Sequence, residues 1–170
     1  VAYRNGHLDV AEYLVKSCKA DVHVENEAGG TALQSAYSKG HLDVVRWLVE
    51  SGQVDINAKD RNGDTALHCT SAGGHLGMVE YLLNSDDLKA DGNAKNNDGN
   101  TALHCASVGG HLDVVKHLVD SGDLMVDGNT KTKAGNTALH LATAHGHLDV
   151  VKWLVEQGEA NINAENHECE

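Results

Sequence analysis

The chain has 170 residues, of which 41% are hydrophobic, but only 4% are aromatic and phenylalanine is absent. Its 25 Asp and Glu outnumber its 13 Lys and Arg, and the resulting formal charge of −12 argues against a nucleic-acid-binding surface. No apolar run approaches the roughly 20 residues that a membrane-spanning helix needs.

The chain opens inside a sequence motif that recurs at a fixed interval. Ala2–Val15 matches only the later part of the motif, and Val1-Ala2-Tyr3 aligns with Ser35-Ala36-Tyr37, the middle of an expected helix. Neither end of the chain shows the polar outer face that a terminal repeat needs. We therefore expect the sequence to be a stretch of a longer array.

Fuller copies of the motif follow at Gly30–Glu50, Gly63–Asn84, Gly99–Asp120 and Gly135–Glu156. The threonines at positions 31, 65, 101 and 137 lie 34, 36 and 36 residues apart. Self-similarity at such a period is typical of stacked-repeat proteins, in which one unit cannot bury its apolar face without its neighbours.

Each full copy predicts two helices, as the copy at 99–120 illustrates. Thr101 is a candidate N-cap, and the helix that begins at Ala102 is expected to end at Val108, before a Gly-Gly pair. A second helix opens near Leu112, and its apolar residues fall on one face. Each unit is therefore a helix, a turn and a second helix.

A polar connector suited to a projecting turn follows each second helix. Ser51-Gly52, Ser121-Gly122 and Gln157-Gly158 are candidate left-handed stops for these helices, whereas Cys18 and Asp86 occupy that position in the other two repeats. The connectors at 85–100 and 121–136 carry two additional residues, so we expect longer or differently bent fingers there.

These residues resemble the ankyrin repeat. The signature T-P-L-H of that family reads T-A-L-H at Thr65, Thr101 and Thr137 and T-A-L-Q at Thr31, and its G-H-L segment is present in all five copies. Proline is absent, and alanine takes its usual place at the helix start. The resemblance implies an all-α solenoid of stacked helix-turn-helix pairs with projecting β-turn fingers. It implies one array over 1–170, with repeats at about 1–28 (truncated), 29–62, 63–98, 99–134 and 135–170.

The histidines and cysteines invite a metal or catalytic interpretation, but eight of the twelve histidines recur at two positions of the repeat. We predict that these eight bind fingers and turns, and that His68, His104 and His140 are buried and neutral. Cys69 and Cys105 are interpreted as small buried hydrophobes, because stacked layers roughly 8–10 Å apart exceed the ~7 Å limit for a disulfide. All four cysteines are expected to be reduced, and no metal or cofactor is expected.

An aromatic column falls at one position of the second helix: Tyr13, Trp47, Tyr81, His117 and Trp153. Such a column is either an exposed stripe for a partner or partly buried packing between layers. The packing interpretation is favoured, because aromatic side chains usually bury most of their area.

The resemblance implies binding of another protein through a concave face formed by fingers and first helices. By repeat phase, the positions expected to contact that partner are Glu27, Ser38, Lys39, Arg61, Asn62, Asp64, Asn97, Asp98, Asn100, Lys133, Asn136 and His145. We expect a non-catalytic, monomeric array that contacts neither nucleic acid nor membrane. No disulfide framework or N-x-Ser/Thr sequon is present, which favours an intracellular, cytoplasmic location. The alternative is a non-catalytic repeat segment of a larger multidomain enzyme or channel.

Overall fold

The computed structural model describes residues 2–24, 31–52, 54–85, 88, 90–120, 126–158 and 160–167. Within these ranges the chain forms nine α-helices and one 3-10 helix, with no β-strand. In chain order they are η1 (Tyr3–Asn5), α1 (Leu8–Lys16), α2 (Ala32–Tyr37), α3 (Leu42–Glu50), α4 (Ala66–Ala72), α5 (Leu76–Asn84), α6 (Ala102–Gly109), α7 (Leu112–Asp120), α8 (Ala138–Ala144) and α9 (Leu148–Glu156). The all-α fold expected from the sequence is confirmed.

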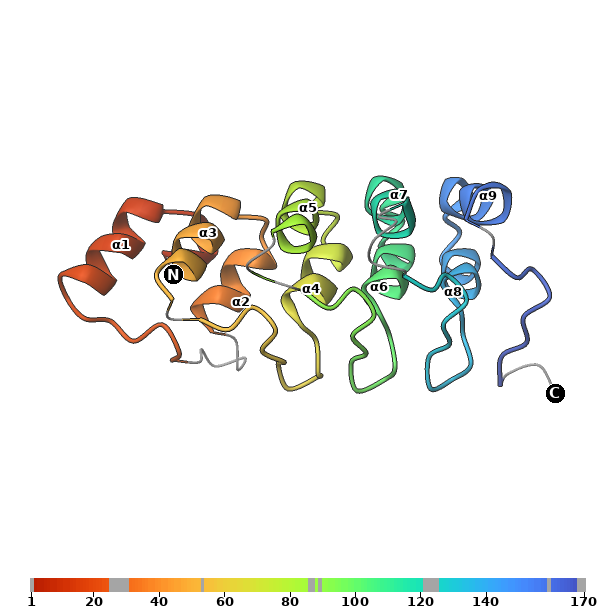
Figure 1. The fold of residues 1–170 in the computed structure, drawn as a ribbon, viewed down its shortest axis with the longest axis horizontal. Coiled ribbons are helices and arrows are strands. Elements are labelled where there is room, and N and C mark those ends of the chain that lie inside the picture. Colours follow the sequence, from red (N-terminus) through yellow and green to blue (C-terminus); the bar gives the residue numbers. More distant parts are fainter. Residues whose placement is uncertain are drawn as a thin grey trace.

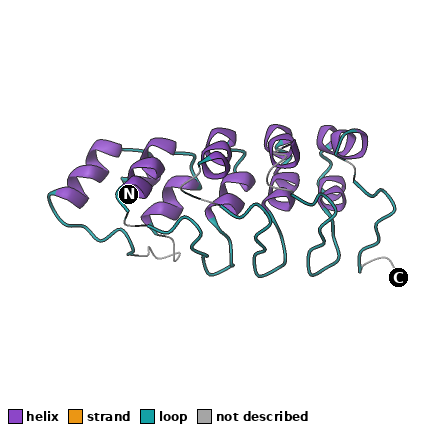
Figure 2. Ribbon diagram, viewed as in Figure 1, coloured by secondary structure: helices purple, strands orange, loops and turns teal. Residues whose placement is uncertain are grey.

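The helices stand in two parallel rows, and the molecule is elongated along them (Figure 1). One row, called here the outer row, contains α1, α3, α5, α7 and α9. The inner row contains α2, α4, α6 and α8, and loops extend from it on the side away from the outer row (Figure 2). Each inner helix packs against the next one along the row and against the outer helix that follows it in the chain. This is the stacked arrangement that the repeat period predicts.

Threonine caps begin the inner helices as expected. In α2 the backbone N–H of Gln34 donates to Thr31 Oγ1 at 3.3 Å, and the Thr31 N–H donates to Gln34 Oε1 at 2.8 Å. This reciprocal pair satisfies two of the amides that a helix start leaves without partners. The inner helix α6 runs one residue beyond the predicted end, to Gly109, because Gly110 rather than Gly109 takes the left-handed conformation, with φ 70°.

The core is a continuous layer of Ala, Leu and Val between the two rows. The central leucines of three inner helices, Leu33, Leu67 and Leu103, are buried, and so are Leu48, Leu82, Leu118 and Leu154 of the outer row. Small and branched apolar side chains suit such thin layers better than large aromatic ones. None of the helices in the described ranges combines the length and the apolar character needed to cross a membrane.

Two expectations about the connectors are only partly met. Gly52 has a left-handed φ of 68°, whereas Gly158 is not among the glycines with positive φ. The helix α9 ends at Glu156 and is capped by Gln157. Ser121-Gly122 and Asp86 lie outside the described residues. The expectation of longer fingers was wrong where the structure can test it, because the turns at 60–64, 96–100 and 132–136 close with the same hydrogen bonds. The additional residues fall nearer the end of the second helix: α3 and α5 end 34 residues apart, whereas Asp55 and Asp91 are 36 apart.

Candidate protein-interaction surface

Each finger is a short turn held by one polar residue at its base. In the finger at 60–64, the Gly63 N–H donates to the Asp60 carbonyl at 3.0 Å, and the Asp60 N–H donates to the Asp64 carbonyl at 2.9 Å. The Asp60 carboxylate also accepts from the Asn62 and Asp64 N–H groups at 2.8 Å each. Gly63 has a φ of 77°, which explains the glycine at this position. Asn96 and Thr132 serve the same purpose in the fingers at 96–100 and 132–136.

Neighbouring fingers are bonded to one another. The Asn97 N–H donates to the Asn62 carbonyl at 2.9 Å, and the Lys133 N–H donates to the Asp98 carbonyl at 2.9 Å. A row of lysines adds a second link, in which Lys59 Nζ donates to the Lys95 carbonyl at 3.0 Å. Lys95 and Lys131 repeat this bond to the following finger. These bonds were not predicted from the sequence, although the 36-residue spacing of the three lysines indicates a shared role in the repeat. The fingers are therefore held to one another by hydrogen bonds and are not independent loops.

The histidines of the inner helices join each repeat to the finger of the next. His68 Nδ1 accepts from the Thr65 N–H at 3.2 Å, so the ring proton resides on Nε2, which donates to the Asn100 carbonyl at 2.9 Å. His104 makes the same bonds to Thr101 and to the Asn136 carbonyl, at 3.1 and 3.2 Å. Both rings are buried. These contacts confirm the predicted structural role.

The histidines of the G-H-L turns point backwards, to the preceding repeat. Nε2 of His41, His111 and His147 donates to a carbonyl at the end of the preceding first-helix segment, at 2.9, 3.0 and 2.8 Å, and His75 does so at 3.4 Å. Each ring lies directly over a turn glycine: a Cβ added to Gly74 would be 2.5 Å from His111 Nδ1. The two sets of histidines thus lock each repeat to both of its neighbours.

His140 departs from the prediction that all three inner-helix histidines are buried. It is half-buried, and its Nδ1 binds Thr137, but no finger carbonyl faces its Nε2 in the described residues. His140 lies in the last described helix pair, and no finger of a following repeat covers its ring in the described residues. For His104, by contrast, burial lowers the pKa of the ring below its usual 6.5, against the opposing effect of its bond to the Asn136 carbonyl.

Acid should weaken the fold through His104. Above pH 6.5 the ring is neutral in both the folded and the unfolded chain, so it does not change the free energy of unfolding. As the pH falls below 6.5, the ring binds a proton in the unfolded chain but stays neutral in the folded chain, which favours unfolding. Between pH 7.5 and 5.5 this ring removes at most about 1.4 kcal/mol of unfolding free energy. His104→Gln is the matched variant, because Gln34 caps α2 with the same hydrogen bonds. Urea unfolding at both pH values should show a smaller acid loss for the variant, and equal losses would refute this role of His104.

The described cysteines lack the features of reactive or metal-binding thiols. Cys69 and Cys105 are half-buried, whereas the sequence predicted that they are buried. Burial first, and then the nearby Asp64 carboxylate, raise the pKa of each thiol to about 12, which keeps both protonated at neutral pH. The described residues contain no group of three or more His, Cys, Asp or Glu side chains that could hold a metal ion.

The predicted partner-binding positions divide into two groups. Eight are exposed, namely Ser38, Lys39, Arg61, Asn62, Asn97, Asp98, Lys133 and His145. Asp64, Asn100 and Asn136 are half-buried. The side chains of two of them accept hydrogen bonds within the array: Asn96 Nδ2 donates to Asp64 Oδ1 and Asn166 Nδ2 to Asn136 Oδ1, each at 2.7 Å. Asn97 is bonded too, through Nδ2 to the Arg61 carbonyl at 3.0 Å. Glu27 lies outside the described residues.

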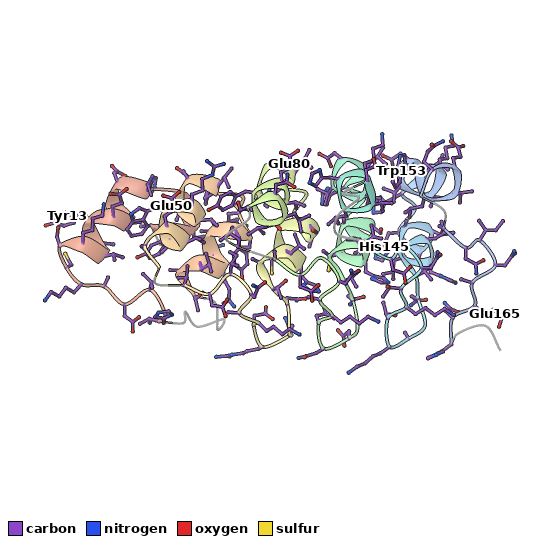
Figure 3. All side chains as sticks on the ribbon, in the orientation of Figure 1. Tyr13, Glu50, Glu80, His145, Trp153 and Glu165 are labelled. Atoms are coloured by element: carbon purple, nitrogen blue, oxygen red, sulfur yellow. The ribbon has the colours of Figure 1, made fainter. Side chains whose placement is uncertain are left out.

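His145 stands at the end of α8 in the inner row (Figure 3). Its ring is stacked on that of His147, with centroids 6.2 Å apart and planes 6° from parallel, and its Nδ1 binds the Leu141 carbonyl at 2.9 Å. The stacking and the hydrogen bond together hold the exposed His145 ring at the end of α8.

The aromatic column of the outer row is mainly packing. Trp47, Tyr81 and Trp153 are half-buried against the core. Cations from the preceding repeat cover two of these rings: Lys16 Nζ lies 5.9 Å from the Trp47 ring centroid, and the Arg46 guanidinium lies 4.8 Å from that of Tyr81. Tyr13, in the first outer helix, is 63% exposed. The favoured packing interpretation therefore holds for the described column except at Tyr13.

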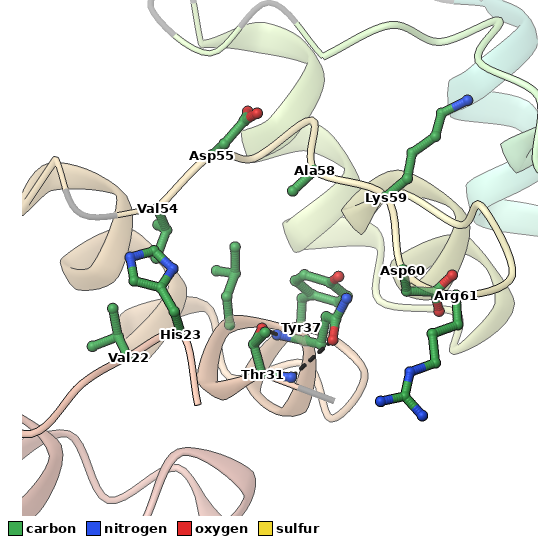
Figure 4. A pocket seen from close by; sticks show the side chains of 12 residues that line it. Val22, His23, Thr31, Tyr37, Val54, Asp55, Ala58, Lys59, Asp60 and Arg61 are labelled. Carbon is green, nitrogen blue, oxygen red and sulfur yellow. Dashed lines mark hydrogen bonds between the residues drawn. The ribbon is translucent and has the colours of Figure 1, made fainter. Parts of the chain in front are cut away.

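A hollow of about 300 Å³ lies between α2 and the finger at 60–64. Thr31 and Tyr37 line one side of it, and Lys59, Asp60 and Arg61 belong to the other (Figure 4). Burial raises the pKa of the Tyr37 phenol, and Cys69 and Asp60 add to that effect. The phenol therefore stays protonated and neutral at neutral pH.

A protein-family model described as ankyrin repeats (3 copies) matches residues 1–96 and 87–166. No curated protein matches the chain.

Proposed function

This chain belongs to the ankyrin-repeat family, and we propose that it binds a partner protein through the exposed residues of its fingers and inner helices. Ankyrin repeats are generally protein–protein interaction modules. The proposed binding strip consists of Ser38, Lys39, Arg61, Asn62, Asn97, Asp98, Lys133 and His145, all of which are exposed.

The main support for this proposal is that the backbone hydrogen bonds of the fingers are constant, whereas the residues at the ends of the fingers differ. We call these two parts the frame and the tips. The frame is the set of backbone bonds between fingers, which repeats from one finger to the next. The tips differ, since Arg61-Asn62 in one finger corresponds to Asn97-Asp98 and Lys133-Ala134 in the next two. Exposed side chains that change on a rigid frame are suited to recognition, because little conformational entropy is lost when a partner binds.

The charge of the strip suggests the kind of partner surface. Its exposed members include three cations, Lys39, Arg61 and Lys133, and one anion, Asp98. Asp64, another acidic residue among the predicted positions, is half-buried and accepts a hydrogen bond from Asn96. The strip is thus more basic than a chain with a formal charge of −12 suggests. We expect the partner to present carboxylates to it, which would favour both encounter and specificity.

The test is a titration with the partner. The array, immobilised, is used to capture a protein from lysate, and purified array variants are then titrated with that protein. Arg61→Ala or Lys133→Ala should cost about 2 kcal/mol or more in binding if either is a hot spot, roughly a thirtyfold loss of affinity. Stability should change by no more than about 0.5 kcal/mol, because both side chains are exposed.

Arg46→Ala is the matched control, since Arg46 is also an exposed arginine but lies on the outer row. If Arg46→Ala weakens binding while Arg61→Ala, Lys133→Ala and Lys39→Ala bind normally, the partner occupies the outer row and the proposed strip is wrong. The intracellular, cytoplasmic location stays a prediction.

A further inference from the structure

One junction between repeats lacks a link that the two following junctions have. His68 of α4 donates to the Asn100 carbonyl of the following finger at 2.9 Å, and α6 repeats this bond one repeat later. The residue at the same position of α2 is Gln34. The carbonyl that corresponds to the acceptor is that of Asp64, and among the described residues it accepts only from the Asp60 N–H. The imidazole link is therefore missing between α2 and the next finger.

The turn histidine of the same junction makes the longest of the corresponding bonds. Nε2 of His75 lies 3.4 Å from the Ser38 carbonyl, whereas the other three turn histidines that bond to a preceding repeat do so at 2.8–3.0 Å. Most N–H···O hydrogen bonds are 2.7–3.2 Å long, so the contact of His75 is a weak one. We call the contact of α2 and α3 with α4 and α5 the α2/α4 junction. Both of its histidine links are absent or weakened.

The sequence also excludes the lysine link at the α2/α4 junction. Lys59 and Lys95 each donate to the backbone carbonyl of the equivalent lysine in the next finger. One repeat before Lys59 the sequence has Glu25, which lies outside the described residues. An ionised carboxylate has no hydrogen to donate to a carbonyl, so the side chain at this position cannot make the bond.

The packing between α2 and the next finger has a gap that reaches the helix. The hollow of about 300 Å³ between them (Figure 4) is lined by Leu33, Gln34 and Tyr37 of α2 itself. One repeat later a hollow of about 430 Å³ lies at the equivalent place, but no described residue of α4 lines it. There the His68 ring, which is 1% exposed, lies between the helix and the finger.

We propose that the array has a built-in point of opening at the α2/α4 junction, where α1, α2 and α3 separate as one unit while the helices from α4 onward stay folded. In a stacked-repeat protein, stability is approximately the sum of each repeat's own stability and its contacts with neighbours. The junction with the fewest links therefore sets where the array divides, and such local openings occur below the free energy of global unfolding. The residues that weaken this junction all lie inside the array.

The proposed binding strip crosses the α2/α4 junction. Ser38 and Lys39 lie on one side of it and Arg61 lies on the other, so the open state presents only part of the strip. This consequence rests on the proposed function. The opening itself does not, because it is measured on the array without a partner.

The test is amide hydrogen exchange of the array in increasing concentrations of urea, below those that unfold it. The proposal predicts that the amides of α2 and α3 exchange through a shared opening, at least about tenfold more populated than the one that exposes the amides of α4 to α7. Exchange of all these helices through a single opening would overturn the proposal.

His68→Gln separates an opening at this junction from one elsewhere. Glutamine keeps the cap of the helix, as Gln34 does in α2, but loses the bond to the Asn100 carbonyl. That bond stays intact when only α1, α2 and α3 open, so exchange in α2 and α3 should not change. Exchange in α4 to α7 should become about fivefold faster, the factor that one net hydrogen bond supplies. An equal acceleration in all helices would contradict the proposal.

Gln34→His tests whether the missing imidazole weakens the junction. The new ring has the position from which His68 caps Thr65 and reaches the next finger, and its acceptor is the Asp64 carbonyl. Exchange in α2 and α3 should become about fivefold slower. If the variant is folded by circular dichroism but exchange in α2 and α3 is unchanged, the absence of the histidine does not set the point of opening and the proposal is wrong. If this variant does not fold, the result for His68→Gln decides.

Discussion

Leu103→Ala should lower the free energy of unfolding by about 2–5 kcal/mol. Leu103 is 1% exposed in α6, at the centre of the array, and packs in a layer that continues through the neighbouring repeats. Truncation removes apolar contact area and leaves a cavity that two rows of bonded helices cannot easily close. Denaturant unfolding at neutral pH measures the effect.

Leu139→Ala is the matched control for this prediction. Leu139 has the same position in α8 but is only half-buried, and it lines a hollow with His140 and Ile162. Its truncation should cost less than about 2 kcal/mol, since less apolar area is lost. Equal losses at the two positions would contradict the view that stability comes from burial between repeats.

Gly74→Ala should destabilise the array by about 2–3 kcal/mol. The residue has a φ of 69°, which costs roughly 1 kcal/mol or more for a residue with a Cβ. The new Cβ would also lie 2.5 Å from His111 Nδ1, so the ring must move away from the Ala72 carbonyl to which it donates at 3.0 Å. Loss of that bond adds about 0.5–1.5 kcal/mol.

Gly146→Ala is the matched control, because it carries the first of these costs without the second. Gly146 has a φ of 75°, but no atom lies within 4 Å of an added Cβ, so only the backbone cost of about 1 kcal/mol is expected. Thermal or urea unfolding of the two variants should show the larger loss of unfolding free energy for Gly74→Ala. If the losses are the same, the turn histidines do not lock the repeats together.

Most of the fold could be predicted because the sequence repeats its own signals. Thr31 and Thr65 start helices, and Gly74 and Gly110 end them, at positions that the period fixes several times over. Details that depend on a neighbour could not be predicted in this way. His104 and His140 occupy the same position in the motif, yet only His104 has a following repeat to bury it.

The binding strip was harder to predict than the fold, because repeat phase gives a position but not its hydrogen bonds. Asp64 and Asn136 are in phase with exposed recognition positions, but each accepts from an asparagine of the next finger. The lysine row was missed for the converse reason: Lys59 and Lys95 look like ordinary solvated charges until the next finger places a carbonyl within reach. Such contacts join residues about one repeat apart, and only the folded stack shows them.

The most direct test of the proposed function is amide hydrogen exchange of the array with and without its captured partner. The proposal predicts added protection in the fingers at 60–64, 96–100 and 132–136 and at the exposed ends of α2 and α8, where Ser38 and His145 lie. Exchange in the outer helices α3, α5 and α7 should be unchanged. Protection confined to those outer helices, with unchanged fingers, would contradict the account.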